Sequence, residues 1–329
     1  MSTPFHYSNP LWNGYCADPF ILRHGDYYYA YGTHYTPANG APGRCTPIDE
    51  KHFVLLRSRN LSSWECLGGA LEVPKAVRGL AYWAPEVVYA RGQFWMYYSA
   101  GDPDDDTTHR LYVAVAETPE GPFRPLKRLP FEGFSIDASP FRDPADGRWY
   151  LFFCQDYLEG ERVGTGIAVV PLADDMVTPQ GEPKPAILPH ADWQISVRNR
   201  PLYGRVFPVW HTVEGPHVIK RGDHYYAFFS GGNWKDASYG IAYALAPHPL
   251  GPWNCLQSEA TVLHSLPGKV IGPGHNSIVI GPDHQTPLLV YHAWDAHHLQ
   301  RQLYIDPIHW TAHGPRVYPT QGPTVCTLK

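Results

Sequence analysis

The chain is poor in charge: only 17% of its 329 residues are Asp, Glu, Lys or Arg, and the formal net charge is −5. Lysine and arginine are scattered without a run, so neither a nucleic acid nor an anionic membrane surface is an expected partner. No uninterrupted apolar stretch reaches the length of a membrane span. This composition favours a small, neutral ligand.

The beginning of the chain and its cysteines carry few signals. The first six residues, Met1 to His6, lack the charged and apolar regions of an export signal, so we expect a cytoplasmic protein unless such a signal has been removed. The six cysteines include no C-x-x-C pair, and a chain of this length does not need disulfides to be stable. We therefore expect reduced thiols.

Aromatic residues and turn formers, in contrast, are abundant, with 22 Tyr, 11 Trp, 30 Gly and 34 Pro. Such a composition favours many short strands joined by tight turns, and no long helical stretch is evident. A turn with glycine followed by an aromatic strand recurs at 25–33, 92–100, 147–154 and 222–232, with a weaker copy at 286–294. A short apolar run precedes each copy, so the repeating unit is a β-hairpin.

Successive hairpins start roughly 55 to 75 residues apart, which suits blades of four strands arranged radially. The sequence therefore predicts an all-β fold, a five-bladed β-propeller with four-stranded blades, formed by residues 1–329 as a single domain. A β-sandwich is the alternative, but its strands would not recur in such similar groups. The proline-rich segments 33–50 and 171–212 are interpreted as loops over one face.

Carboxylates recur at the entrance of the first strand of the repeating unit. Because the first strands of a propeller line its central channel, residues just ahead of them gather around one mouth. Aligned on the hairpin turns, these positions hold Asp18, the segment Trp83-Ala84-Pro85, Asp137, Glu214 and His275. Aspartate before a turn is ordinary strand-entrance chemistry, but three matched carboxylates predict a catalytic centre in which like charges raise at least one pKa.

The sequence resembles family 43 of the glycoside hydrolases. The resemblance is carried, in order along nearly the whole chain, by Ala17-Asp-Pro-Phe-Ile-Leu-Arg-His-Gly-Asp-Tyr-Tyr28, Trp83-Ala-Pro-Glu-Val87, Ser135-Ile-Asp-Ala-Ser-Pro-Phe141, Glu214-Gly-Pro-His217 and Gly274-His-Asn-Ser277. It implies that Asp18 is the general base that activates water and Glu214 the general acid. Asp137 would orient the acid and raise its pKa, as in an inverting mechanism.

Aromatic residues and arginine near these strand entrances are candidate sugar-binding groups. Trp83, Trp193 and His211 are predicted to contact substrate, with core packing as the alternative for the tryptophans. The resemblance adds Arg301, which would reach toward the substrate and the base. No H-E-x-x-H motif is present, so a catalytic zinc is not expected. The resemblance implies that His275 lies beneath the pocket, where a structural calcium ion or a water cluster occupies the axis; no cofactor is expected to be required.

These residues predict a glycosidase acting on small oligosaccharides. The leading hypothesis is an exo-acting α-L-arabinofuranosidase on arabinan or arabinoxylan oligosaccharides. A β-D-xylosidase or an endo-arabinanase would use the same carboxylates, because specificity lies in the loops. A non-catalytic carbohydrate-binding propeller is the alternative of another class, but such a protein would keep equivalent residues in every blade. The sequence does not determine the oligomeric state.

Overall fold

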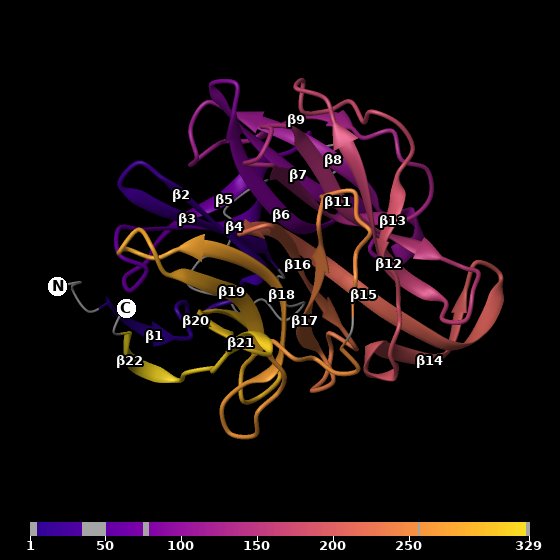
Figure 1. Ribbon diagram of the computed structural model, residues 1–329. Helices are drawn as coiled ribbons and strands as arrows, with labels where there is room; N and C mark the ends of the chain where they lie inside the picture. Colours follow the sequence, from indigo (N-terminus) through magenta and orange to yellow (C-terminus); the bar gives the residue numbers. More distant parts are fainter. Residues whose placement is uncertain (1–4, 35–50, 75–78, 256, 327–329) are drawn as a thin grey trace.

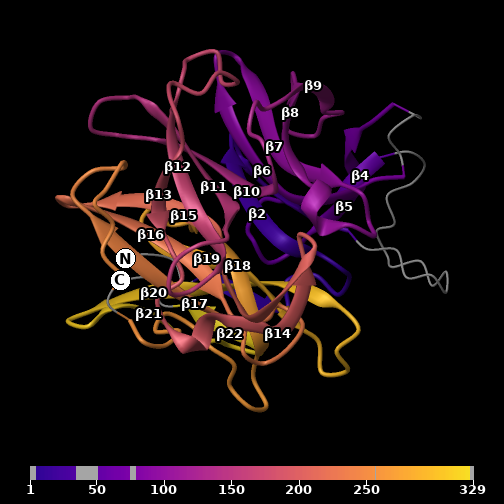
Figure 2. The ribbon, with the colours of Figure 1, turned by 90° about the vertical axis from the view of Figure 1, so that its right-hand side faces the viewer.

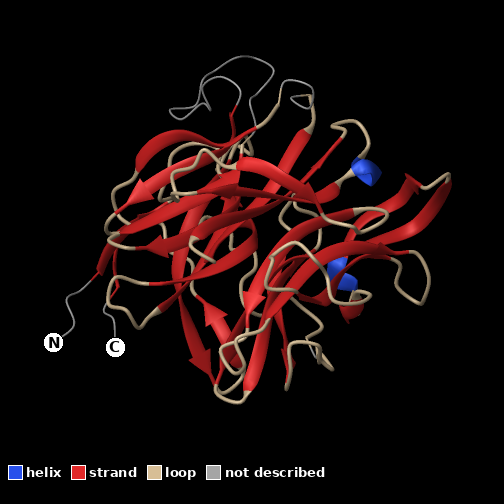
Figure 3. Ribbon diagram, turned by 90° about the horizontal axis from the view of Figure 1, so that it is seen from above, coloured by secondary structure: helices blue, strands red, loops and turns tan. Residues whose placement is uncertain are grey.

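A computed structural model of the protein describes residues 5–34, 51–74, 79–255 and 257–326, and nearly all of their regular structure is β-strand (Figures 1 and 3). The helical elements in these ranges are two short 3-10 turns, η2 (Asp106–Thr108) and η3 (Asp192–Gln194). The predicted all-β class is therefore confirmed. Within the same ranges, no helix has the length and apolar character that crossing a bilayer requires.

Most strands belong to five groups in which consecutive strands pair antiparallel. The first two groups are β2 (Ala17–His24), β3 (Tyr27–Thr33), β4 (Lys51–Ser58) and β5 (Glu65–Glu72), then β6 (Ala81–Ala90), β7 (Gln93–Gly101), β8 (Arg110–Ala116) and β9 (Arg124–Arg128). The third is β10 (Ser135–Arg142), β11 (Trp149–Tyr157), β12 (Gly164–Leu172) and β13 (Lys184–Ile187). The last two are β15 (Arg205–Arg221), β16 (His224–Gly231) and β17 (Gly240–Ala246), then β18 (Ile271–Ile280), β19 (Pro287–Trp294), β20 (Arg301–Thr311) and β21 (Gly314–Val317).

The fourth group departs from the predicted four strands. Its three strands are supplemented by the isolated bridges Ile241↔Leu263 and Leu245↔Asn254. It is also joined to the third group, because β12 pairs in parallel with β15 at Gly164↔His211 and Thr165↔Thr212. Outside the five groups, β1 (Phe5–Asn9) pairs with β22 (Gly322–Cys326), which brings the two ends of the chain side by side (Figure 1).

The first strands of the five groups form a closed ring. Strand β2 contacts β6, β6 contacts β10, β10 contacts β15, β15 contacts β18, and β18 contacts β2 again. Figure 2 shows these strands near the middle of the molecule, with β4, β5, β9 and β14 further out. Five clusters of buried side chains fill the spaces between successive groups, including the space between the last group and the first.

Packing between the groups explains why their second strands are mostly apolar or aromatic and buried. Each group is covered on both faces by its neighbours. Its strands are therefore hydrophobic on both sides, instead of alternating between apolar and polar residues. In β7 every residue after Gln93 is buried. Tight turns connect such strands: Ala90 pairs with Gln93, and the two residues between them, Arg91 and Gly92, both have positive φ (54° and 80°), as a type I′ turn requires.

The segment 171–212, expected to be loops, contains regular structure. It includes β13 and the hairpin formed by β14 (Ile195–Leu202) and the first part of β15, which projects at the right of Figure 1. Two prolines, Pro201 and Pro208, concealed this hairpin in the sequence; proline is tolerated here because the ribbon leaves N–H groups unpaired at its edge. Of the other predicted loop, 33–50, residues 35–50 lie outside the described residues.

The expectation of reduced cysteines is wrong for Cys66, which is disulfide-bonded. Its partner is not among the side chains that the structure describes. Cys16, Cys154 and Cys255 are free. Cys66 lies in β5, the last strand of the first group.

Candidate active site

The first strand of each of the five groups, β2, β6, β10, β15 and β18, has a β-bulge at the equivalent point. Antiparallel pairing between the first and second strand of each group breaks there, and one residue at each break adopts positive φ. These residues are Asp18 (49°), Ala84 (49°), Asp137 (58°), Gly215 (59°) and His275 (47°). Because a bulge redirects the adjacent side chains, the repeated bulge turns chemically different groups toward one mouth.

This repeat corrects one position of the sequence alignment. Gly215, not Glu214, is the structural equivalent of Asp18 and Asp137. Glu214 stands one residue earlier and pairs with Ser230, as Ala17 pairs with Thr33. A side chain at Gly215 would also meet the His275 ring at about 3.2 Å, so glycine suits this position for two reasons. The acid candidate therefore reaches the centre from a different point of its strand than the two aspartates.

The N–H groups of the bulges link each group to the one before it. Ala84 N donates to Thr33 Oγ1 (2.9 Å), Asp137 N to Ser99 Oγ (3.3 Å) and His275 N to Ser230 Oγ (2.8 Å). The ring closes where Asp18 N donates to His292 Nδ1 (3.0 Å). These acceptors occupy equivalent positions in the second strands, so the groups are locked together directly beneath the carboxylates.

The link between the third and fourth groups uses different atoms, and it fixes the side chain of Asp137. The equivalent position in β11 is Cys154, whose thiol is a weaker acceptor than a hydroxyl. The Gly215 N–H donates instead to Asp137 Oδ2 (3.0 Å), and the Cys154 thiol contacts the same oxygen (3.7 Å). Asp137 is thus fixed in place by the backbone that carries Glu214.

Asp18 lies among positively polarised groups. Its Oδ1 is 3.1 Å from Arg301 Nη1 and 3.5 Å from His275 Nδ1. Burial alone would raise the pKa of Asp18, but the positive charge of Arg301, followed by that of His275, holds it well below its usual range. Asp18 is therefore ionised at neutral pH, the state a general base requires.

Glu214 has the opposite environment. Its Oε1 accepts a hydrogen bond from Tyr239 Oη (2.7 Å). Burial, followed by the negative charge of Asp137, raises the pKa of Glu214 to about 7. Burial also raises the pKa of Asp137, although His275 opposes it. A carboxyl group with a pKa near 7 retains its proton over much of the neutral range, which suits a general acid.

His275, predicted as an axial metal ligand, lies between the carboxylates. Its Nδ1 is 3.5 Å from Asp18 Oδ1 and 3.9 Å from Asp137 Oδ2, and despite burial these carboxylates raise its pKa. Calcium prefers six to eight oxygen ligands, and the described residues hold no group of three candidate ligand side chains. This donor set does not fit a protein-coordinated calcium ion, so we derive no step through one.

Arg301 stands at the junction between Asp18 and an aromatic surface. Besides Asp18, its Nε donates to Tyr15 Oη (3.0 Å), and its guanidinium lies 4.4 Å from the centroid of the Trp234 ring. Trp234 and Trp294 are nearly parallel (12°), with centroids 6.2 Å apart. An arginine clamped in this way is held in one orientation toward the carboxylate.

The other residues predicted to contact substrate, Trp83, Trp193 and His211, have different surroundings. Trp83 stacks on His109 at 3.5 Å between centroids, beside the bulge of β6. Trp193 packs against Phe229 and Gly231, next to the residue that pairs with Glu214. His211 is buried and its Nδ1 lies 3.1 Å from Val163 O. It stands three residues before Glu214, so strand alternation directs it to the opposite face of β15.

Sequence reasoning missed three residues of the centre. His292 had a signal, because it occupies the position in the second strand that Thr33, Ser99 and Ser230 occupy elsewhere. Tyr239 and Trp234 had none: both lie at or before the start of β17, and only the folded chain brings that connection to Glu214 and Arg301.

Comparisons with known proteins give one consistent family. A family model described as glycosyl hydrolases family 43 matches residues 7–315. The β-D-galactofuranosidase of Aspergillus niger is 26% identical over 302 residues, which cover 86% of this chain and 75% of the relative. The extracellular exo-α-(1→5)-L-arabinofuranosidase of Streptomyces chartreusis is 27% identical over 304 residues, covering 88% and 83%. The crystal structure of a thermostable family-43 glycoside hydrolase superposes with a TM-score of 0.79 at 30% identity, covering 97% and 99%.

The names of these relatives overturn the expected cytoplasmic location. Four relatives with extracellular in their names come from two Streptomyces species, Bacillus subtilis and Cellvibrio japonicus. The disulfide at Cys66 agrees with this correction, since disulfides persist in oxidising compartments.

Proposed function

Because the chain belongs to family 43 of the glycosyl hydrolases and is therefore a glycosidase, we propose that it removes terminal α-L-arabinofuranosyl units from arabinan or arabinoxylan oligosaccharides by an inverting mechanism. The observation that carries the mechanism is the contrast between Asp18, whose pKa is held low, and Glu214, whose pKa is raised to about 7. The exo-arabinofuranosidases among the relatives support the choice of sugar.

In the proposed reaction each carboxylate has one task. Asp18 takes a proton from water as the water attacks the anomeric carbon, and Glu214 gives its proton to the departing glycosidic oxygen. Asp137 keeps Glu214 protonated through its negative charge and is fixed by the Gly215 N–H. His275 and Arg301 stabilise the ionised base. Trp83 and Trp193 are proposed to border the sugar.

The architecture is also part of the proposal. We infer that the five groups of strands are the blades of a five-bladed propeller whose channel is lined by β2, β6, β10, β15 and β18. Support comes from the closed ring of contacts between these strands and from the hydrophobic clusters between all neighbouring groups.

A galactofuranosidase is a second candidate, favoured by the Aspergillus niger relative. α-L-Arabinofuranose has the ring of β-D-galactofuranose without the terminal hydroxymethyl carbon, so the same carboxylates would serve either sugar. Relatives named as xylosidase/arabinosidase and arabinan endo-1,5-α-L-arabinosidase keep a β-D-xylosidase and an endo-arabinanase as further alternatives.

The test is release of 4-nitrophenol from its α-L-arabinofuranoside, β-D-galactofuranoside and β-D-xyloside. We expect the arabinofuranoside to be the best substrate and Asp18→Ala to lower its turnover by at least about a thousandfold, because the attacking water loses its base. Asp223→Ala, in the exposed turn between β15 and β16, is the matched control and keeps full activity. A preference for another glycoside would keep the mechanism and change the sugar; full activity of Asp18→Ala would refute the mechanism.

A further inference from the structure

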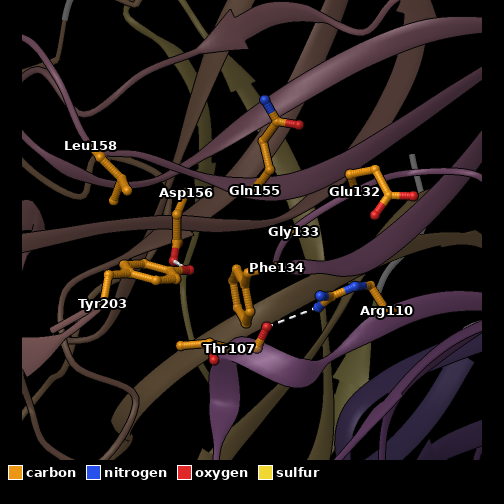
Figure 4. A pocket seen from close by; sticks show the side chains of 9 residues that line it. All are labelled: Thr107, Arg110, Glu132, Gly133, Phe134, Gln155, Asp156, Leu158 and Tyr203. Carbon is orange, nitrogen blue, oxygen red and sulfur yellow. Dashed lines mark hydrogen bonds between the residues drawn. The ribbon is translucent and has the colours of Figure 1, made fainter.

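A polar cavity of about 400 Å³ lies between the second and third groups of strands. Its lining comes from four separate segments: η2 and the start of β8, the loop before β10, the end of β11, and the tip of the β14–β15 hairpin (Figure 4). The volume falls within the range of about 300–1,000 Å³ that is typical of small-molecule sites. No residue proposed above for catalysis lines it.

The cavity is connected to the catalytic centre through β11. Cys154 contacts Asp137 Oδ2, and the next two residues, Gln155 and Asp156, line the cavity. At about 3.3 Å per residue, Asp156 lies roughly 7 Å along the strand from Cys154. The first strands begin at the same end of the molecule, so cavity and carboxylates share one face. Trp83 stacks on His109, the residue that precedes Arg110 of the cavity wall.

The lining groups are suited to a neutral, hydroxyl-rich ligand. Asp156 accepts hydrogen bonds from Tyr203 Oη (2.7 Å; Figure 4) and from Thr165 Oγ1 (2.9 Å), so its carboxylate is held by hydroxyl groups. Arg110 is already bound to the carbonyl oxygens of Thr107 and His109, both at 2.8 Å. The carboxylates of Asp156 and Glu132 disfavour an anion.

Aromatic rings complete this lining. In Figure 4, Phe134 lies between Arg110 and Tyr203, and its ring faces the space between them. Flat apolar rings surrounded by fixed donors and acceptors bind the alternating C–H and O–H groups of a sugar.

We propose that this cavity binds the sugar unit next to the one held by the carboxylates, on the leaving-group side of the scissile bond, with Tyr203 at its rim and Asp156 as its polar anchor. The inference rests on the proposed function, because it assigns a place to the remainder of the oligosaccharide. It also gives the β14–β15 hairpin a role: the hairpin carries Tyr203 to the mouth of the cavity, where Asp156 fixes the ring.

The experiment measures binding by calorimetry in the Glu214→Gln background, where turnover is slow. The probes are methyl α-L-arabinofuranoside, which has a single sugar, and (1→5)-α-L-arabinotriose. We expect Tyr203→Ala to lower the affinity for the triose relative to the methyl glycoside by about tenfold, the loss of an aromatic contact and a hydrogen-bonding group. Asp156→Asn, which keeps the shape of the side chain, is expected to lower the same ratio severalfold.

The control is Tyr318→Ala, a tyrosine that is 62% exposed on another part of the surface, which leaves both affinities unchanged. An unchanged ratio in both cavity variants would overturn the inference alone. If the Glu214→Gln background binds neither probe, the proposed function fails and the inference fails with it. If it binds only the corresponding xylosides, the same ratio measured with xylotriose and methyl β-D-xyloside decides the inference independently of the sugar.

Discussion

Asp18 and Glu214 belong to one centre, yet the groups around the two carboxyls differ in charge. Around Asp18 stand the guanidinium of Arg301 and the imidazole of His275, and the pKa of Asp18 is held low. Around Glu214 stand the neutral hydroxyl of Tyr239 and the carboxylate of Asp137, and its pKa is raised to about 7. The neighbouring groups therefore set the pKa values of two carboxyl groups apart, in the directions that the proposed base and the proposed acid require.

Among variants of Glu214, Arg301 and Tyr239, the largest effect is expected when the proposed acid, Glu214, is replaced. Glu214→Gln keeps the shape but cannot donate a proton, so kcat/KM for an arabino-oligosaccharide should fall by about 10²–10⁴-fold. The 4-nitrophenyl glycoside should suffer much less, because its leaving group needs little protonation. Measuring both substrates separates proton donation from misfolding, and Glu65→Gln, on the outer strand β5, is the control.

The pH profile tests the same assignment. In the proposed mechanism Glu214 acts in its protonated form, so wild-type kcat/KM should decline as pH rises through about 7, and this decline should be absent in Glu214→Gln. An equal loss on both substrates, or an alkaline decline that survives the substitution, would show that another group is the acid.

A smaller effect is expected when the positive charge next to the proposed base, Asp18, is removed. Arg301→Gln removes the positive charge that lowers the pKa of Asp18 most. The pKa of Asp18 therefore rises, and the acid limb of the kcat/KM profile moves to higher pH. At neutral pH we expect a loss of about 10–100-fold from misorientation of the base. Arg301→Lys retains the charge and should restore the acid limb but not the full rate, since lysine lacks the second donor that reaches Tyr15.

A purely structural role for Arg301 would give another pattern. It would lower activity equally at all pH values and leave the acid limb in place in both variants. Thermal unfolding of the two proteins, compared with wild type, shows whether any loss of rate reflects loss of folded protein.

Much of this centre follows from the repeat in the sequence. Glycine turns and aromatic strands mark each hairpin, so Asp18, Asp137 and His275 can be placed near the entrances of the first strands, although the distance to the turn varies from seven residues (Asp18 to Gly25) to ten (Asp137 to Gly147). The first and fourth hairpins have the same spacing, seven residues from Asp18 to Gly25 and from Gly215 to Gly222, so their comparison points to Gly215 rather than Glu214 as the repeat position. Glu214 was found by its chemistry and its motif.

Other features have no local signal. The contacts of Tyr239 with Glu214 and of Trp234 with Arg301 depend on how the connection before β17 folds over the mouth. The β14–β15 hairpin is marked by proline, which usually indicates a loop, and its stability comes from pairing with a long neighbouring strand. Such long-range contacts are set by tertiary packing, which propensity and periodicity do not encode.

The smallest expected effect refines the acid side. Tyr239→Phe removes one hydrogen bond that favours the ionised form of Glu214, while the ring keeps its stacking on His292 (5.8 Å between centroids). The pKa of Glu214 should therefore rise above about 7, by up to about one unit, since one such bond contributes about 1 kcal/mol. The alkaline limb of kcat/KM then moves upward and the variant gains activity relative to wild type at alkaline pH. A downward or absent shift would mean that Tyr239 does not act on the proton of Glu214, and that burial and Asp137 alone set the acid side apart from the base side.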